Sequence, residues 1–518
     1  MTCPEPIVGV HLDLKYMTAS KAYLTRWIQM LPQMGINTLL IEYEDKFPYQ
    51  SHPYLKAPGA FTPDELRAFL ALARKVGLMP VPLVQTFSHL EFVFGHPQLA
   101  HLRELPDVHT QLDSSNPQAT QLIKTLIGEV LAYHEVDPLF HLGGDETMYL
   151  GSNPRTSLEK QKLGTLGLWT KHISQFVDQV HTAGKRAIVW DDIFWHVTPE
   201  EILASKLDRR VMLHCWNYAA GIKEQSLANL SSRTQVYHQA GFSTIAGPCL
   251  NWGVGTPQHQ HCLNNTLAWA ITAKKHQMKG MINTAWSCFH VLPHAQTLTV
   301  ACTGQMMKDP QMPDVQWQEE VMGHHFQTDA QGFVQAMQDT QTFWEVSVGL
   351  ERPLTAILFG NMDMVLWFPD GHKGRCREGA YGHDIRKVDF SLVLHKKLEH
   401  LRKHNTDGAI SSRLRSHVEP LQSAAATFGR IASSARANVP EALYYLWMTQ
   451  MKCCYAQLLA HLLDNQPIPQ ELLFQWQHIG QQTQEILAPL VDEYAIEHLK
   501  NLWWTPMAHQ LQNQPVPA

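Results

Sequence analysis

The amino-acid sequence predicts a (β/α)8 barrel over residues 1–310, followed by an all-helical domain over residues 311–518. Three observations lead to this fold class. Eight short, apolar, β-branched runs alternate with longer amphipathic segments in the first part, as in a parallel sheet closed into a barrel. Helix-capping residues fall in the gaps between those runs. Beyond residue 310, strand-like runs become rare and helical periodicity dominates.

The predicted strands share an apolar stretch bounded by turn-forming residues. In chain order they are Ile7–Leu14, Thr38–Tyr43, Met79–Leu83, Leu139–Gly143, Arg186–Trp190, Val211–Trp216, Ser243–Ala246 and Gly280–Ala285. Thr62 and Thr198 are each followed by proline and two acidic residues, which is typical of a helix N-cap with proline at the first helical position. Glycine is expected at the C′ position where a helix ends before the next strand, at Gly35, Gly77, Gly184 and Gly241.

Helical periodicity organises the remainder of the chain. The predicted helices are Gln316–Phe343, Phe390–His404, Leu414–Ala437, Glu441–Asn465 and Glu471–Glu493. One loop-like stretch, Pro369–Arg375, interrupts them, and Trp503-Trp504 is expected to anchor a final helix. We expect this domain to pack on the barrel or on another subunit. A homodimer in which the Pro369–Arg375 loop caps a neighbouring pocket is one hypothesis.

Composition excludes several classes of protein. The chain has 518 residues, of which 44% are hydrophobic, so it can bury a large core. A net charge of -6 without a basic block argues against nucleic acid as a partner. The nine cysteines include no CxxC pair, which indicates reduced thiols. The His and acidic residues show no HExxH spacing, so we expect no metal and no cofactor. No signal peptide or long apolar run is visible, which predicts a cytoplasmic protein with no membrane partner.

The C-terminal ends of barrel strands carry the active site in this fold class, so residues at those ends are the functional candidates. They are rich in carboxylates and tryptophans. Tryptophan stacks on the apolar faces of sugar rings, while Asp, Glu, His and Lys hydrogen-bond the hydroxyls. The set predicts a sugar pocket, with substrate contacts from Asp13, Lys15, Asp45, His89, Trp190, Asp191, Asp192, Trp216, Tyr218, Trp252 and Trp286.

The segment Phe140–Thr147 holds the strongest signal, the adjacent carboxylates Asp145 and Glu146 after a Gly-Gly pair. The two-residue period of a strand directs Asp145 toward the barrel axis. We expect Gly143 and Gly144 to leave room for a close ligand. Two carboxylates in one pocket can divide glycoside cleavage between a proton donor and a charge stabiliser.

Five blocks of the sequence carry a resemblance to a known family. They are His11–Lys15, Leu40–Tyr49, Pro82–Phe92, His141–Glu146 and Val189–Asp192. The H-x-G-G-D-E block with a downstream W-D-D resembles the family-20 glycoside hydrolases, the β-N-acetylhexosaminidases, and within them most closely the hexosaminidase D group. The blocks span about the first 290 residues in the expected order.

The resemblance implies exo-acting, retaining, substrate-assisted hydrolysis of terminal β-linked GlcNAc or GalNAc. Glu146 would be the general acid and base, and Asp145 would orient the acetamide and stabilise the charged intermediate. Tyr218 would hydrogen-bond the acetamido oxygen, and Trp190, Trp216 and Trp286 would enclose the sugar. An aromatic pocket is expected to raise the pKa of Glu146.

The sequence departs from the family pattern at two places. Lys15 stands near the position where many members carry a sugar-binding arginine, and it lacks the bidentate fork of arginine. Trp286 is followed by Ser287, where many members carry an acidic residue nearby.

Two alternatives stay open from the sequence. One is an O-GlcNAcase-type hydrolase in which Asp191 and Asp192 are the working pair. The other is a non-catalytic sugar-binding barrel. His89 is expected to contact either a sugar hydroxyl or a catalytic carboxylate.

Overall fold

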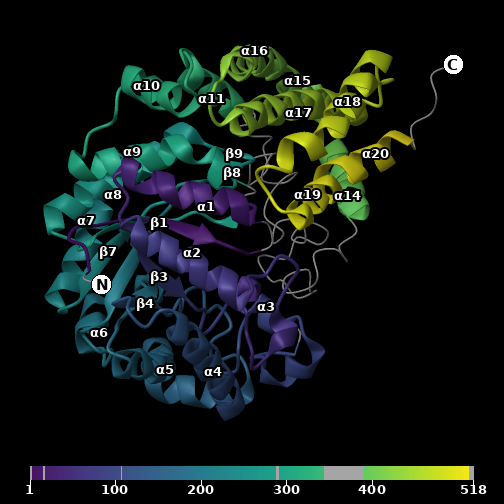
Figure 1. The fold of residues 1–518 in the computed structure, drawn as a ribbon. Helices are drawn as coiled ribbons and strands as arrows, with labels where there is room; N and C mark the ends of the chain where they lie inside the picture. Colours follow the sequence, from purple (N-terminus) through teal and green to yellow (C-terminus); the bar gives the residue numbers. More distant parts are fainter. Residues whose placement is uncertain (1–2, 16–17, 107, 288–290, 343–389, 513–518) are drawn as a thin grey trace.

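A closed barrel of eight parallel strands forms the first part of the chain, which confirms the predicted fold class (Figure 1). The computed structural model describes residues 3–15, 18–106, 108–287, 291–342 and 390–512. The barrel strands are β1 (Ile7–Asp13), β2 (Thr38–Glu42), β3 (Met79–Leu83), β4 (Leu139–His141), β5 (Arg186–Trp190), β6 (Met212–Trp216), β7 (Ser243–Gly247) and β10 (Gly280–Asn283).

The barrel closes where β1 pairs with β10, from Ile7 opposite Gly280 to Val10 opposite Asn283. All eight strands coincide with the predicted runs. The largest boundary differences are in β4, which ends at His141 rather than Gly143, and in β10, which ends at Asn283 rather than Ala285. Gly143 and Gly144 have φ values of 60° and 90°, so the backbone leaves the extended conformation there.

Helices separate the strands. They are α1 (Lys21–Met30), α2 (Pro63–Lys75), α3 (Glu91–Phe94), α4 (Pro117–Tyr133), α5 (Pro154–Thr182), α6 (Pro199–Ala204), α7 (Glu224–Gln239), α8 (His259–His276) and α9 (Thr297–Lys308). Thr62 and Thr198 form complete capping boxes, as predicted. The four glycines expected at helix ends all have positive φ.

The second part of the described chain is helical. Its α-helices are α10 (Val315–Phe326), α11 (Phe333–Thr342), α14 (Phe390–His404), α15 (Ala409–Ser416), α16 (Val418–Ser434), α17 (Val439–Leu463), α18 (Gln470–Leu487), α19 (Glu493–Leu499) and α20 (Thr505–Gln512). The single helix predicted over Gln316–Phe343 is wrong, because Gln327 adopts a left-handed conformation and ends α10. The helix predicted over Leu414–Ala437 is divided at His417.

The aromatic residues near the end of the chain pack against two long helices. Trp504 stacks between Trp447 of α17 and Trp476 of α18, at centroid distances of 5.6 and 4.8 Å. Trp503 is buried beside them. These residues precede α20 and agree with the anchoring role expected from the sequence. The predicted loop Pro369–Arg375 lies outside the described residues.

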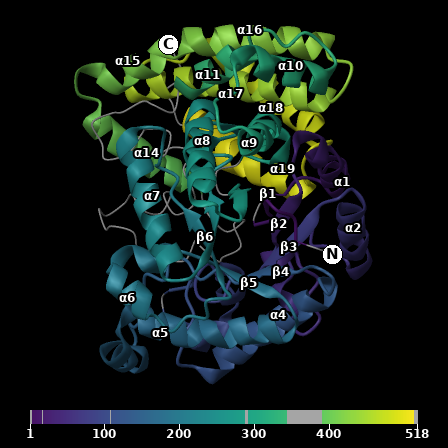
Figure 2. The same cartoon turned by 90° about the vertical axis from the view of Figure 1, so that its left-hand side faces the viewer.

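The helical region lies over the α8 and α9 side of the barrel in both views (Figures 1 and 2). One continuous apolar cluster joins the two parts, from Val8 and Trp27 to Trp447. Polar contacts cross the same boundary, including a hydrogen bond of 3.0 Å from the Tyr23 hydroxyl to Glu441 of α17. The division into domains at residue 310 stays a prediction. Among the described residues, the helices are too short or too polar to cross a membrane.

Candidate active site

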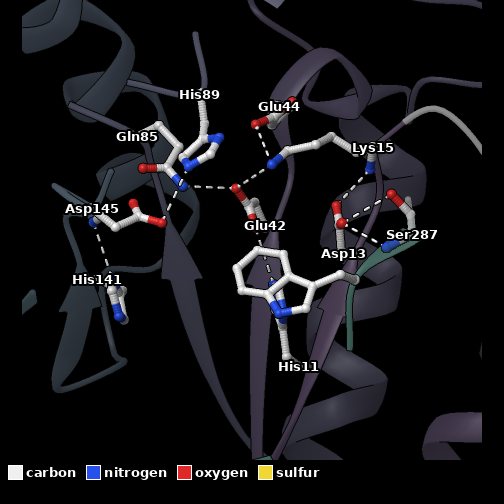
Figure 3. Close-up of polar contacts among 12 residues, drawn as sticks. His11, Asp13, Lys15, Glu42, Glu44, Gln85, His89, His141, Asp145 and Ser287 are labelled. Atoms are coloured by element: carbon white, nitrogen blue, oxygen red, sulfur yellow. Dashed lines mark hydrogen bonds and ion pairs between the residues drawn. The ribbon is translucent and has the colours of Figure 1, made fainter. Parts of the chain in front are cut away.

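Glu42, the last residue of β2, is a buried carboxylate that contacts side chains from β1 and from the segments after β1 and β3. Its oxygens lie 3.2 Å from His11 Nε2 and 3.1 Å from Lys15 Nζ, and they accept a 3.0 Å hydrogen bond from Gln85. Burial alone would raise the pKa of Glu42, but Lys15 and His11 hold that pKa well below its usual range. Figure 3 shows Lys15 reaching between Glu42 and Glu44, 3.1 Å from each. The ammonium group is therefore held by two carboxylates.

Asp13 connects β1 to the segment that follows β10. It accepts hydrogen bonds of 2.9 Å from both the backbone N–H and the hydroxyl of Ser287, and one of 2.8 Å from the backbone of Lys15. The residue after Trp286 therefore has a partner in the site, although it departs from the family pattern. Asp45 lies farther out, with its carboxylate 3.8 Å from Lys46 Nζ.

The candidate catalytic pair is bridged by one histidine. His89 Nε2 lies 3.3 Å from Asp145 Oδ2 and 3.4 Å from Glu146 Oε2 (Figure 3 draws the contact with Asp145). Burial alone would lower the pKa of His89, but the two carboxylates raise it well above its usual value. His89 and Glu146 both have positive φ, 55° and 46°, a conformation that costs free energy in residues other than glycine. Backbone strain of this kind is concentrated at functional sites.

The electrostatic state of Glu146 differs from the prediction. Burial raises its pKa, yet the hydrogen bond and charge of His89 are stronger and lower it below the usual value. The expected raised pKa of Glu146 is therefore wrong. Its side chain is 42% exposed, so the carboxylate lies at the mouth of the site, whereas Asp145 is buried.

The two glycines before the pair do not provide room for a ligand. A Cβ atom at Gly143 would lie 1.9 Å from Gln85 Oε1, and one at Gly144 would lie 3.0 Å from Trp169 Cζ2. Protein side chains already fill both spaces, so the predicted role of these glycines is wrong. They allow Gln85 and Trp169 to pack against the strand end, and Trp169 donates a 2.8 Å hydrogen bond to the Gly144 carbonyl.

The side chains of Asp191 and Asp192 have different hydrogen-bond partners, although the two residues are adjacent in sequence. Asp191 is 0% exposed and accepts hydrogen bonds from Trp216 N at 3.1 Å and the Tyr237 hydroxyl at 3.0 Å. Arg233 Nε lies 3.4 Å from the same carboxylate. Asp192 instead accepts the backbone N–H of Glu146 at 2.8 Å. One carboxylate is thus satisfied inside the protein, and the other holds the backbone of the candidate acid.

Aromatic side chains from the last strands form a connected group. Trp286 Nε1 donates a 3.0 Å hydrogen bond to the Tyr218 hydroxyl, and the Tyr218 ring lies 4.9 Å from Trp216 and 6.3 Å from Trp252. Trp190 is 0% exposed and lies inside the barrel, 5.9 Å from Trp286. Trp252 is the most exposed of the five, at 37%. The candidates of the later strands therefore form one contiguous aromatic cluster, with Trp190 in the barrel interior.

Several residues of the site were not among the predicted substrate contacts. Asn251 joins two segments, because its amide accepts the backbone N–H of Trp286 at 2.9 Å and donates to the Trp286 carbonyl at 2.9 Å. His11 and His214 lie one strand period before Asp13 and Trp216, so the two-residue repeat could have identified them. The described residues contain no group of three or more His, Cys, Asp or Glu suited to a metal ion.

Comparisons with known proteins identify a family and several relatives of this chain. The family model for the catalytic domain of glycosyl hydrolase family 20 matches residues 9–291. Hexosaminidase D from Bos taurus is 31% identical over 290 residues, which cover 54% of this chain and 83% of the relative. Human Hexosaminidase D is 29% identical over 393 residues, or 71% of this chain and 80% of the relative. The latter similarity is too long to end with the barrel.

The structural comparison supports the fold. The crystal structure of the chitobiase from Flavobacterium johnsoniae aligns with a TM-score of 0.51 and 17% sequence identity. The alignment covers 96% of this chain and 78% of the chitobiase chain.

Proposed function

The chain belongs to glycosyl hydrolase family 20, and from this premise we propose that it removes terminal β-linked GlcNAc or GalNAc from glycoconjugates or oligosaccharides by substrate-assisted catalysis. The chain is therefore an enzyme that hydrolyses glycosidic bonds, and the alternative of a non-catalytic sugar-binding barrel is set aside. One observation carries the mechanistic proposal. Asp145 and Glu146 stand side by side at the end of β4, joined through His89.

In the proposed first step, the acetamido carbonyl oxygen of the substrate attacks C1 while the bond from C1 to the leaving oxygen breaks. Glu146 gives its proton to that oxygen. Its exposure at the mouth of the site suits contact with a leaving group. Asp145 accepts the acetamide N–H and stabilises the positive charge that develops on the oxazolinium ring. In the second step Glu146 takes a proton from water, which attacks C1 and opens the ring.

His89 is the proposed source of the proton that Glu146 needs as a general acid. Because the two carboxylates raise the pKa of His89, the group of three carries a proton before the substrate binds. We propose that Glu146 receives this proton when the acetamide N–H of the substrate donates a hydrogen bond to Asp145, because Asp145 then holds the protonated His89 less strongly. Tyr218 would donate its hydroxyl to the acetamido oxygen, and Trp216 and Trp286 would contact the sugar ring.

The proposal is tested with aryl β-glycosides of GlcNAc and GalNAc and the substitution Glu146→Gln. Glutamine keeps the shape of the side chain but cannot transfer a proton, so we expect kcat to fall by about 10²–10⁴-fold. The loss should be greater for aryl groups that leave less readily. An aryl β-glucoside serves as the control, because it lacks the acetamido group. No turnover of either N-acetyl substrate, or equally fast turnover of the glucoside, would refute the proposal.

The O-GlcNAcase-type alternative needs Asp191 and Asp192 to act on the sugar together. The internal partners of Asp191 favour the pair Asp145 and Glu146 instead. A cytoplasmic location and a homodimer formed through the helical region stay predictions.

A further inference from the structure

A small hairpin follows Trp252 at the edge of the site. It consists of β8 (Gly253–Val254) and β9 (Thr256–Pro257), which pair antiparallel around Gly255. Its base is closed by a 2.6 Å hydrogen bond from the Gln258 backbone to the Trp252 carbonyl. A two-stranded hairpin of this length is not stable by itself in water. The position of Trp252 therefore depends on what the hairpin packs against.

One face of α17 supports the hairpin. Tyr444, Met448 and Lys452 are spaced four residues apart, so they lie on the same side of the helix. The Tyr444 hydroxyl donates a 2.7 Å hydrogen bond to the Gly255 carbonyl, and Lys452 Nζ donates one of 2.6 Å to Thr256 Oγ1. Figure 1 shows β8 and β9 beneath α17.

Between these hydrogen bonds, the hairpin backbone lies directly on Met448. A Cβ atom at Gly255 would come within 2.5 Å of Met448 Sδ and Cε, and the φ of Gly255 is +71°. Any other residue would be strained at this turn and would displace Met448. The contact is thus a close fit of backbone to side chain.

Tyr444 also contacts the segment that follows Trp286. Its ring lies 4.2 Å from that of His294, edge to face, and His294 belongs to the 3-10 turn η7 (Pro293–Ala295) after Trp286. The side chain of Asn251, next to Trp252, is hydrogen-bonded to the Trp286 backbone. The same helix therefore contacts the hairpin that follows Trp252 and the turn that follows Trp286.

Lys452 is an unusual residue for a contact that serves packing alone. It is 1% exposed, and burial lowers the pKa of its amine to about 7. Placing an amine inside a protein costs free energy, which an apolar residue would avoid. Its hydrogen bond to Thr256 gives the hairpin a directional contact that an apolar residue would not provide.

From this geometry we propose that Tyr444, Met448 and Lys452 form a clamp that positions Trp252 for substrate binding. The clamp makes the helical region part of the substrate site of the barrel. This inference rests on the proposed sugar-binding role of Trp252, which borders Tyr218. The three are positioning residues, because they act through the hairpin and do not touch the sugar.

The first test compares Tyr444→Phe and Lys452→Met with the matched control Tyr445→Phe. Tyr445 is the next residue of α17, and its ring packs against Phe428 and Phe333, away from the hairpin. Loss of one hydrogen bond should raise KM for an aryl N-acetylhexosaminide about fivefold and leave kcat nearly unchanged. The control should change neither constant. In a Trp252→Ala background the clamp substitutions should no longer alter KM.

The second test needs no substrate. Hydrogen–deuterium exchange should be faster for residues 251–258 in Tyr444→Phe and Lys452→Met, while exchange in α17 itself should remain as in the wild type. The proposed function fails by itself if the wild-type enzyme turns over no N-acetyl substrate, and exchange then decides on the clamp. Unchanged exchange in the hairpin, an unchanged KM despite faster exchange, or a KM effect that persists without Trp252 would overturn the inference.

Discussion

Substituting Asp191 and Asp145 separately by asparagine distinguishes the two candidate acidic pairs. The Asp191 carboxylate is inside the protein, where it receives two hydrogen bonds and faces Arg233. Asparagine keeps its shape but removes its charge, so Arg233 loses its counter-ion. We expect Asp191→Asn to affect the stability of the fold, and Asp145→Asn to affect the reaction.

The size of the first effect follows from burial. Breaking a buried ion pair by removing one partner costs about 3–5 kcal/mol. The Arg233 side chain is 21% exposed, and this access to water places the expected loss at about 3 kcal/mol, the lower end of that range. For Asp145 the balance is different, because it stands close to the like charges of Glu146 and Asp192. Neutralising it relieves this repulsion but also removes the attraction to His89, 3.3 Å away, so the two effects offset and stability should change by less than about 1 kcal/mol.

Urea unfolding followed by circular dichroism measures the free energy of unfolding of each variant, and kcat on an aryl N-acetylhexosaminide measures the effect on the reaction. Asp145→Asn should lower kcat by about 10²–10³-fold, as expected for a group that stabilises transition-state charge. Folded Asp191→Asn should keep kcat within about tenfold, since its direct hydrogen bond to a site residue is to the backbone of Trp216. The reasoning is refuted if Asp191→Asn is as stable as the wild type but inactive, while Asp145→Asn still turns over substrate.

Two further substitutions test the surroundings of the pair. In the proposed mechanism the proton that Glu146 uses is lost from the free enzyme at the raised pKa of His89, so His89→Gln should move the alkaline limb of the kcat/KM profile to lower pH. A limb that stays in place or moves to higher pH would contradict this role. Gly143→Ala should destabilise the protein by about 2.5–5 kcal/mol, from the positive φ and from the loss of the Gln85 hydrogen bond to β2. Gly77→Ala is its control in urea unfolding, because φ is also positive but no atom lies within 4 Å of the added Cβ, and equal losses at the two positions would show that the Gln85 contact is unimportant.

Local sequence patterns were sufficient for most of the fold. These patterns depend only on residues close together in the sequence. The structure confirms the strand runs, the caps at Thr62 and Thr198, and the glycines at helix ends. The helix break at Gln327 was missed because neither glycine nor proline marks it. There a glutamine takes the left-handed conformation that the sequence rules assign to glycine.

The residue types of the site were also accessible from sequence, but their partners were not. Whether Gly143 faces a ligand or Gln85, and whether Glu146 has a raised or lowered pKa, depends on side chains from β3 and its loop. Asp191 and Asp192 look equivalent as neighbours in the chain. Only their different surroundings in the barrel separate an internal ion pair from a contact with the Glu146 backbone.

The sequence by itself determined the barrel and the family and singled out the candidate acidic pair, because strand alternation and the H-x-G-G-D-E block are short-range patterns that a single chain displays. The tertiary structure decided which carboxylates are satisfied inside the protein and what holds Trp252. Tyr444 and Lys452 reach the hairpin across 189 and 196 residues of sequence. Contacts at that separation leave no periodic signal, because they are made only when the helical region packs against the barrel.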